Sequence, residues 1–219
     1  MSGFFEKISR AGLILAALGI FLLVMSVGDT VTSFKPAKSF EDVEFGEVEL
    51  AAGDHVEGEV PFLFDSFAIE QTWTENKSNN SRTPKKTSRH YYVMPCGDNL
   101  AGLSVGTKNA PEASDLVDQT YGYLSGGAAP TAELTLDCRV VAMEEELAEM
   151  FREELKEYYD YTDQEIEDMG ALLMVEPRDF MMVRIFCGAG AVLTLLGAGL
   201  LVGRWRKVSA RQRQEEYEL

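Results

Sequence analysis

Two long apolar runs lie near the ends of the chain, and they constrain its fold more than any other feature. Residues 11–28 contain no charged side chain, and residues 180–203 contain only Arg184. A helix of about 18 residues is about 27 Å long, close to the roughly 30 Å thickness of a bilayer's hydrocarbon core. A helix of this length in a soluble protein usually keeps a polar face, which both runs lack. We therefore predict a transmembrane helix over each run.

The first run also has features of a secretory signal peptide. Lys7 and Arg10 precede it, and small residues, Ser26 and Gly28, lie near its end. Its apolar stretch is longer than the roughly 7–15 residues usual for such signals, which favours a retained anchor. Cleavage remains the alternative, and it would leave one anchoring helix without changing the side on which the middle of the chain lies.

The charges that flank the two runs predict the orientation in the membrane. Lys7 and Arg10 precede the first run, and five lysine or arginine residues between 204 and 213 follow the second. Such residues stay on the cytoplasmic side. We therefore expect residues 1–10 and 204–219 in the cytoplasm and residues 29–179 outside it. The outer segment has 12 basic and 32 acidic residues, a net charge of −20, against −16 for the whole chain.

Polar and small residues within the runs give further expectations. Arg184 lies about one helical turn inside the outer end, so we expect its side chain to reach the headgroups, and the alternative is that it marks an ion path or a polar partner. Gly199 and Gly203 form a GxxxG pair, and Gly12 with Ala16 forms a similar small-residue pair. Such pairs let helix backbones approach closely. They favour packing of the two helices on each other, on another membrane or envelope protein, or on a second copy of the chain.

The middle segment mixes two periodicities in an irregular order. Apolar residues alternate in some stretches, which indicates strands, and recur every three or four residues in others, which indicates helices. Because the order lacks regular βαβ repetition, we predict an α+β domain, preceded by a linker over residues 29–40. Strands are expected at 43–50, 56–73, 90–95, 100–106 and 131–143, helices at 111–124 and 143–159, a short helix capped by Thr162 and Glu165, and an extended segment at 171–177.

A basic, polar stretch interrupts this acidic domain. It contains Lys77, Arg82, Lys85, Lys86 and Arg89 against one acid, Glu75. A hairpin loop over residues 75–90 explains the composition without a ligand. The alternative is a contact site for an anionic polymer, a phosphate or a partner protein. Nucleic acid is disfavoured, because the acidic domain beside the loop repels phosphates. These five basic residues are our predicted binding residues.

Two cysteines fall in the outer segment, Cys96 and Cys138, and a third, Cys187, lies in the second run. The extracytoplasmic side is the more oxidising one, so a Cys96–Cys138 disulfide is one prediction and two separate thiols are the other. A nucleophilic Cys96 served by His90, with Asp98 nearby, would make the domain a hydrolase-like envelope enzyme.

Motifs for metal or cofactor chemistry are missing. The chain has two histidines and no CxxC or HxxxH spacing, and it has no phosphate-binding loop or dinucleotide fingerprint. The acidic run over residues 160–168 lacks the glycine and glutamate that an EF-hand needs. We therefore predict no metal, no cofactor and no catalytic residue. The leading hypothesis is a membrane-anchored binding module, an accessory subunit of a cell-envelope complex, and the envelope enzyme is the alternative.

Three stretches carry a resemblance to known sequences. They are GDHVEGEVPFLFDSFAIEQ, SRHYYVMPCGD with the polar loop before it, and LTLDCRVVAMEEELAEMFREEL. With the two apolar runs, they make the chain similar to a family of uncharacterised two-span membrane proteins of anaerobic Gram-positive bacteria. The resemblance implies an anchored outer domain, but it implies no activity and no functional residue.

Overall fold

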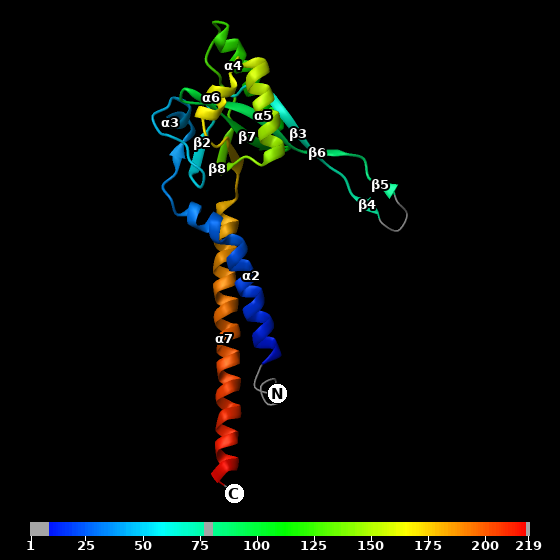
Figure 1. Cartoon of the computed structure of the whole chain (residues 1–219), viewed down its shortest axis with the longest axis vertical. Coiled ribbons are helices and arrows are strands. Elements are labelled where there is room, and N and C mark those ends of the chain that lie inside the picture. The colour runs from blue at the N-terminus through cyan, green and yellow to red at the C-terminus, as the bar shows by residue number, and fades with distance from the viewer. Residues whose placement is uncertain (1–8, 77–80, 218–219) are drawn as a thin grey trace. The chain divides into compact units, whose positions relative to one another are not determined.

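The chain folds into two units. The computed structural model describes residues 9–76 and 81–217. One unit is formed by residues 35–179, and the other by the two terminal segments, Met1–Phe34 and Phe180–Leu219. Figure 1 follows the chain from one terminus to the other by colour.

The terminal unit is a pair of helices, α2 (Arg10–Ser33) and α7 (Phe180–Tyr217). Ser9 caps α2 by accepting a hydrogen bond from the backbone N–H of Gly12 at 3.2 Å. Both helices are long and apolar enough to cross a membrane. Large apolar side chains point outward from both, including Phe21 and Leu195, which are 58% and 72% exposed. The predicted linker over residues 29–40 was wrong in part, because α2 continues to Ser33.

Glycines form the seam between α2 and α7. A Cβ atom added to Gly19 would lie 2.6 Å from the carbonyl oxygen of Gly190, and one added to Gly197 would lie 2.5 Å from the backbone nitrogen of Ala16. Only glycine fits such close approaches. By contrast, a Cβ added to Gly199 or Gly203 would meet no atom of the described residues within 4 Å. The predicted GxxxG pair therefore lies outside this seam, and the Gly12–Ala16 pair lies in it.

Arg184 contacts the other helix. Its guanidinium donates hydrogen bonds to the backbone oxygen of Ser33 and, at 3.3 Å, to the hydroxyl of Ser33. It also lies 5.3 Å from the centre of the Phe34 ring. These groups form the C-terminal end of α2, where a cation is favoured by the helix dipole. These contacts favour the alternative interpretation of Arg184, in which it has a polar partner, over a side chain that reaches the headgroups.

The unit of residues 35–179 is α+β, as predicted. Within the described residues its main sheet has seven strands, in the order β1-β2-β8-β9-β7-β6-β3. The pairs β1–β2 and β7–β9 are parallel and the other neighbours are antiparallel. The strands are β1 (Lys38–Ser39), β2 (His55–Glu59), β3 (Ser66–Thr72), β6 (Lys86–Cys96), β7 (Asn99–Gly106), β8 (Thr135–Ala142) and β9 (Leu173–Pro177).

Apolar side chains cover both faces of this sheet. One cluster joins Leu136 and Val140 of β8 to α3 (Phe40–Glu44) and α4 (Ala110–Leu124). The other joins Val93 of β6 to α5 (Glu145–Tyr158) and α6 (Asp163–Asp168). Because strand side chains alternate between faces, residues next to Leu136 and Val140 in the sequence point to the second face. Asp137 and Arg139 are such residues.

Most predicted elements of this unit are present, with two corrections at its start. The strand predicted over residues 43–50 is absent, since Ser39 caps a short helix, α3, by accepting a hydrogen bond from the N–H of Asp42. The strand predicted over 56–73 is broken between β2 and β3, where Pro61 cannot donate to a sheet ladder. The capping box of Thr162 and Glu165 is confirmed at the start of α6.

Candidate functional site

The predicted basic loop forms an arm. Strands β3 and β6 pair out to Thr72 and Lys86, and beyond them a second ribbon pairs β4 (Glu75–Asn76) with β5 (Ser81–Arg82). Figure 1 shows this hairpin extending away from the sheet. We call the described residues 73–76 and 81–86 the arm. It is more regular than a loop, because its two sides pair as strands, with Glu75 opposite Arg82 and Asn76 opposite Ser81.

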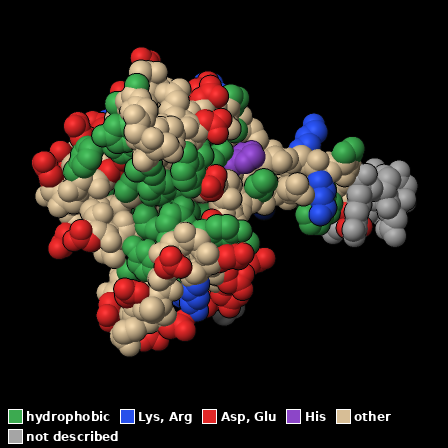
Figure 2. All heavy atoms as spheres, turned by 90° about the horizontal axis from the view of Figure 1, so that it is seen from above, with side chains coloured by type: hydrophobic (Ala, Val, Ile, Leu, Met, Phe, Trp, Pro, Cys, Tyr) green, Lys and Arg blue, Asp and Glu red, His purple; other side chains and the backbone are tan. Residues whose placement is uncertain are grey.

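The arm carries a cation beside an aromatic ring. The Lys85 ammonium lies 5.4 Å from the centre of the Trp73 ring, which is 49% exposed. The N–H of Thr74 donates a hydrogen bond to the Thr83 hydroxyl at 2.8 Å, which joins the two sides of the arm next to Trp73 and Lys85. Lys86, at the base of the arm, is also exposed. Figure 2 shows lysine or arginine side chains on the arm and acidic side chains spread over the body.

The five predicted binding residues fall in four different places. Lys85 and Lys86 are exposed together. Arg89 lies within the sheet, and its Nε is 3.9 Å from Oε2 of Glu70, so an acid offsets its charge. Lys77 lies outside the described residues. Arg82 lies in β5, opposite Glu75. The arm therefore offers Lys85, Lys86 and Trp73 as its defined contact surface.

A cavity of about 700 Å³ opens beside the turn between β6 and β7. Cys96 and Asp98 both line it, but His90 is not among its lining residues. Burial, and next the charge of Glu44, raise the pKa of the Cys96 thiol. A protonated thiol is a weak nucleophile. The structure thus joins two residues of the predicted enzymatic trio and disfavours a reactive Cys96.

Glu44 is a buried acid on the wall of this cavity. It is 5% exposed, and its Oε2 accepts a hydrogen bond from the backbone N–H of Phe62 at 3.1 Å. Its Oε1 has no hydrogen-bond partner within the described part of the chain. Burial raises the pKa of Glu44 to about 9, against a smaller opposing effect of the Phe62 hydrogen bond. The carboxyl is therefore neutral at physiological pH. In the strand predicted over residues 43–50, Glu44 would alternate with Val43 and Phe45 and face solvent, so its burial was not predicted.

The cysteines are free thiols. Cys138 lies in the core, opposite Val56, and burial raises the pKa of its thiol. Cys96 packs against the edge of the same apolar cluster. Of the two predictions for this pair, the structure has the separate thiols and not the disulfide.

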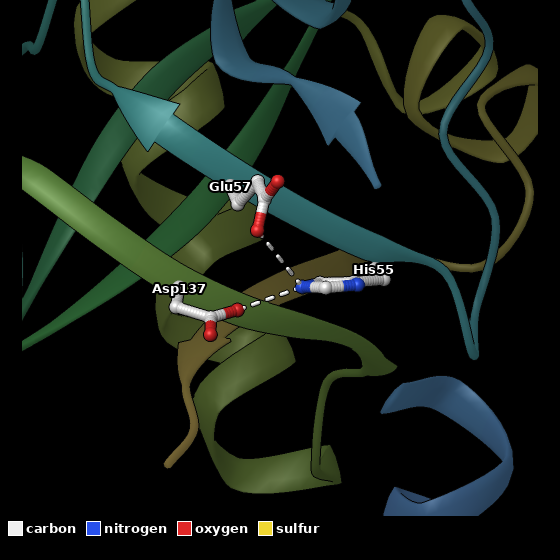
Figure 3. A group of neighbouring side chains, drawn as sticks. All are labelled: His55, Glu57 and Asp137. Carbon is white, nitrogen blue, oxygen red and sulfur yellow. Dashed lines mark hydrogen bonds and ion pairs between the residues drawn. The ribbon is translucent and has the colours of Figure 1, made fainter. Parts of the chain in front are cut away.

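A third group of side chains lies on the second face of the sheet (Figure 3). Nε2 of His55 is 2.7 Å from Oδ1 of Asp137 and 3.8 Å from Oε2 of Glu57. The three donor atoms lie within 4.8 Å of one another, a separation at which they could hold a metal ion. No metal site was predicted, because the chain has no closely spaced histidine pair and no CxxC motif. The available signal was weaker, a histidine and a glutamate two residues apart on one strand.

A family model matches residues 2–202 of the chain, and its description is a domain of unknown function, DUF8577. The chain belongs to this family. The DUF8577 match covers α2, the α+β unit and α7 as far as residue 202, and it supports the expected membership of an uncharacterised family. No curated protein and no solved structure matches the chain significantly.

Proposed function

We propose that this DUF8577 chain is a membrane-anchored interaction module of the cell envelope, and that its arm contacts a protein partner. The two terminal helices anchor it as a two-span protein, both termini lie in the cytoplasm, and residues 35–179 lie outside. The outward apolar side chains of α2 and α7 support this anchoring, because water disfavours so much exposed apolar surface. The resemblance to two-span proteins of anaerobic Gram-positive bacteria supports it too.

The observation that carries the proposal is the position of the arm's charges. Lys85 and Lys86 lie together on a hairpin that extends from the body, whereas most charged residues of the unit are acidic. A partner with an acidic patch is attracted to the arm and repelled by the acidic remainder of residues 35–179. These opposite forces orient the partner as it approaches. Trp73 adds an exposed ring of the kind that dominates contact energies at interfaces. We therefore expect an acidic surface on the partner, with an apolar pocket for Trp73.

Crosslinking in intact cells tests this proposal. A photoreactive residue is placed at Thr83 on the arm, and the bound protein is identified by mass spectrometry. We expect one dominant envelope protein, and we expect its yield to fall at least tenfold in a K85E/K86E double variant. Lys108→Glu is the matched control, because Lys108 is an exposed lysine of the same unit outside the arm.

Two results would contradict the proposal. Equal crosslinking yields in the K85E/K86E variant and the Lys108→Glu control would show that the arm's charges do not contribute to partner binding. Crosslinked adducts with an anionic envelope polymer, and none with protein, would show that the arm contacts a polymer and not a protein. Thermal unfolding of each variant in detergent confirms that the fold is retained.

A further inference from the structure

We infer that His55, Glu57 and Asp137 form a binding site for a divalent transition metal of the zinc class. This inference is independent of the arm and of its partner. It rests on three side chains that the fold brings together from two strands (Figure 3).

The register of the sheet fixes two of the three ligands. Strands β2 and β8 are antiparallel, and Glu57 is directly opposite Asp137. Side chains directly opposite on one face have Cβ atoms about 4.5–5.5 Å apart, and two like charges there destabilise the pair. This face therefore favours a cation between the two carboxylates. His55, two residues before Glu57 on the same strand, lies on the same face.

The burial of the three groups suits a site that opens to solvent on one side. The His55 side chain is 7% exposed, so neighbouring atoms restrict its ring. Its Nδ1 is buried, and its Nε2 is the atom directed at the two acids. The side chains of Asp137 and Glu57 are 48% and 59% exposed, so an ion can enter between them and keep a water ligand. Three protein ligands and one open position are the usual set for an accessible zinc ion.

The distances are close to those that an ion imposes. A tetrahedral zinc ion with bonds of about 2.0–2.1 Å holds its ligand atoms about 3.3 Å apart. The observed separations from Nε2, 2.7 Å to Asp137 and 3.8 Å to Glu57, lie on either side of that value. Rotation of the exposed Glu57 side chain closes the longer one. The ion would replace the proton that His55 and Asp137 share in their hydrogen bond.

The surrounding charges allow a cation here. Arg139 lies opposite His55, and it has Glu176 as its own cross-strand neighbour on β9. The remaining acid of β2, Glu59, follows Glu57 on the same face. An imidazole ligand selects zinc, copper, nickel or iron over magnesium and calcium, which prefer sites built of oxygen alone. We therefore commit to zinc as the test ion.

The chain has two histidines, so the signals of His90 serve as an internal reference for those of His55. The full chain, purified in detergent without a histidine tag, is labelled with ¹⁵N on its imidazoles and titrated with Zn²⁺. We expect the His55 ring nitrogens to shift in a saturable manner at one ion per chain, while the His90 signals stay in place. Mg²⁺ at the same concentration is expected to leave both rings unchanged.

Variants separate a built site from surface adsorption. Glu57→Gln and Asp137→Asn keep exposed side chains of the same shape, and each is expected to weaken Zn²⁺ binding at least tenfold. His90→Asn is the matched control and is expected to bind as the unaltered chain does. No shift of His55 with Zn²⁺, an equal shift of His90, or unchanged affinity in both acid variants would overturn the inference. The arm is intact in all these variants, so partner crosslinking is expected to persist whichever result is found.

Discussion

Glu44 shows how one buried residue makes stability depend on pH. Its pKa is about 9 in the folded chain, whereas the pKa of an unperturbed glutamate is 4.5. Between these two values the folded state binds a proton that the unfolded state has lost. The stability that the proton provides is complete below the unfolded pKa and is lost as the pH rises through about 9. The neutral acid therefore favours folding at low pH.

We expect Glu44→Gln to be more stable than the unaltered chain at neutral and alkaline pH. Glutamine keeps an oxygen for the Phe62 N–H and carries no charge to desolvate. The gain is at most about 3 kcal/mol at pH 7, because each pKa unit corresponds to roughly 1.4 kcal/mol. Thermal unfolding in detergent, measured from pH 4 to pH 9, checks it.

The matched control for that experiment is Glu41→Gln, since Glu41 is an exposed acid of the same helix, α3. Its effect on the unfolding temperature is expected to be small at every pH. A difference between Glu44→Gln and the unaltered chain that stays constant from pH 4 to pH 9 would show that Glu44 is ionised in the folded state.

Residues that belong to one periodic element were predictable, and those whose role depends on distant pairing were not. The capping box of Thr162 and Glu165 is local, and it was found from spacing alone. His55 and Asp137 are 82 residues apart in the chain, and only the β2–β8 register brings them together. No periodicity within either strand carries that information. A local charge contrast marked Lys85 and Lys86, and their role in binding stays a prediction.

At the scale of elements, the same division separates the correct predictions from the wrong ones. Strong alternation predicted β6, β7 and β8, and apolar residues at helical spacing predicted α4 and α5. Alternation failed at residues 43–50, because a short run such as Val43, Glu44 and Phe45 also fits one turn of helix. The Ser39 cap and the burial of Phe40 and Val43 decide for the helix.

The glycine seam of the two apolar helices gives a prediction at this scale. In Gly197→Leu the added side chain meets the backbone of Ala16 and forces α2 and α7 apart. We expect the unfolding temperature in detergent to fall by several degrees, because neither backbone can move aside cheaply. Gly199→Leu is the control on the same helix, because a Cβ there meets no described atom.

The same control tests the predicted self-association through Gly199 and Gly203. If a second copy packs there, Gly199→Leu lowers the oligomer fraction measured by crosslinking and leaves the unfolding temperature of the single chain unchanged. If Gly197→Leu and Gly199→Leu lowered the unfolding temperature equally, Gly197 and Gly199 would lie in the same kind of contact, which contradicts the geometry of the seam.

At the scale of the whole molecule, the charge distribution separates two groups of basic residues. Lys85 and Lys86 are on the arm, and Arg211 and Arg213 are exposed near the end of α7. The proposed topology puts these groups on opposite sides of the membrane, since basic residues that flank a span remain in the cytoplasm whereas long outer segments are translocated largely regardless of charge. Both groups are substrates for trypsin, so one protease reports on both sides.

We call residues 204–219 the tail. We expect trypsin to cut the arm in right-side-out membrane vesicles and to leave the tail uncut there. In inside-out vesicles we expect the opposite, with cleavage after Arg211 and Arg213 and an intact arm. Mass spectrometry of the released peptides distinguishes the two sets of cuts, and detergent lysis should allow both, which controls for sites that are simply resistant. Cleavage of the tail in right-side-out vesicles would show that the orientation is the reverse of the proposed one. Recovery of the intact chain from the soluble fraction without detergent would mean that the outward apolar side chains of α2 and α7 are covered by protein and not by lipid.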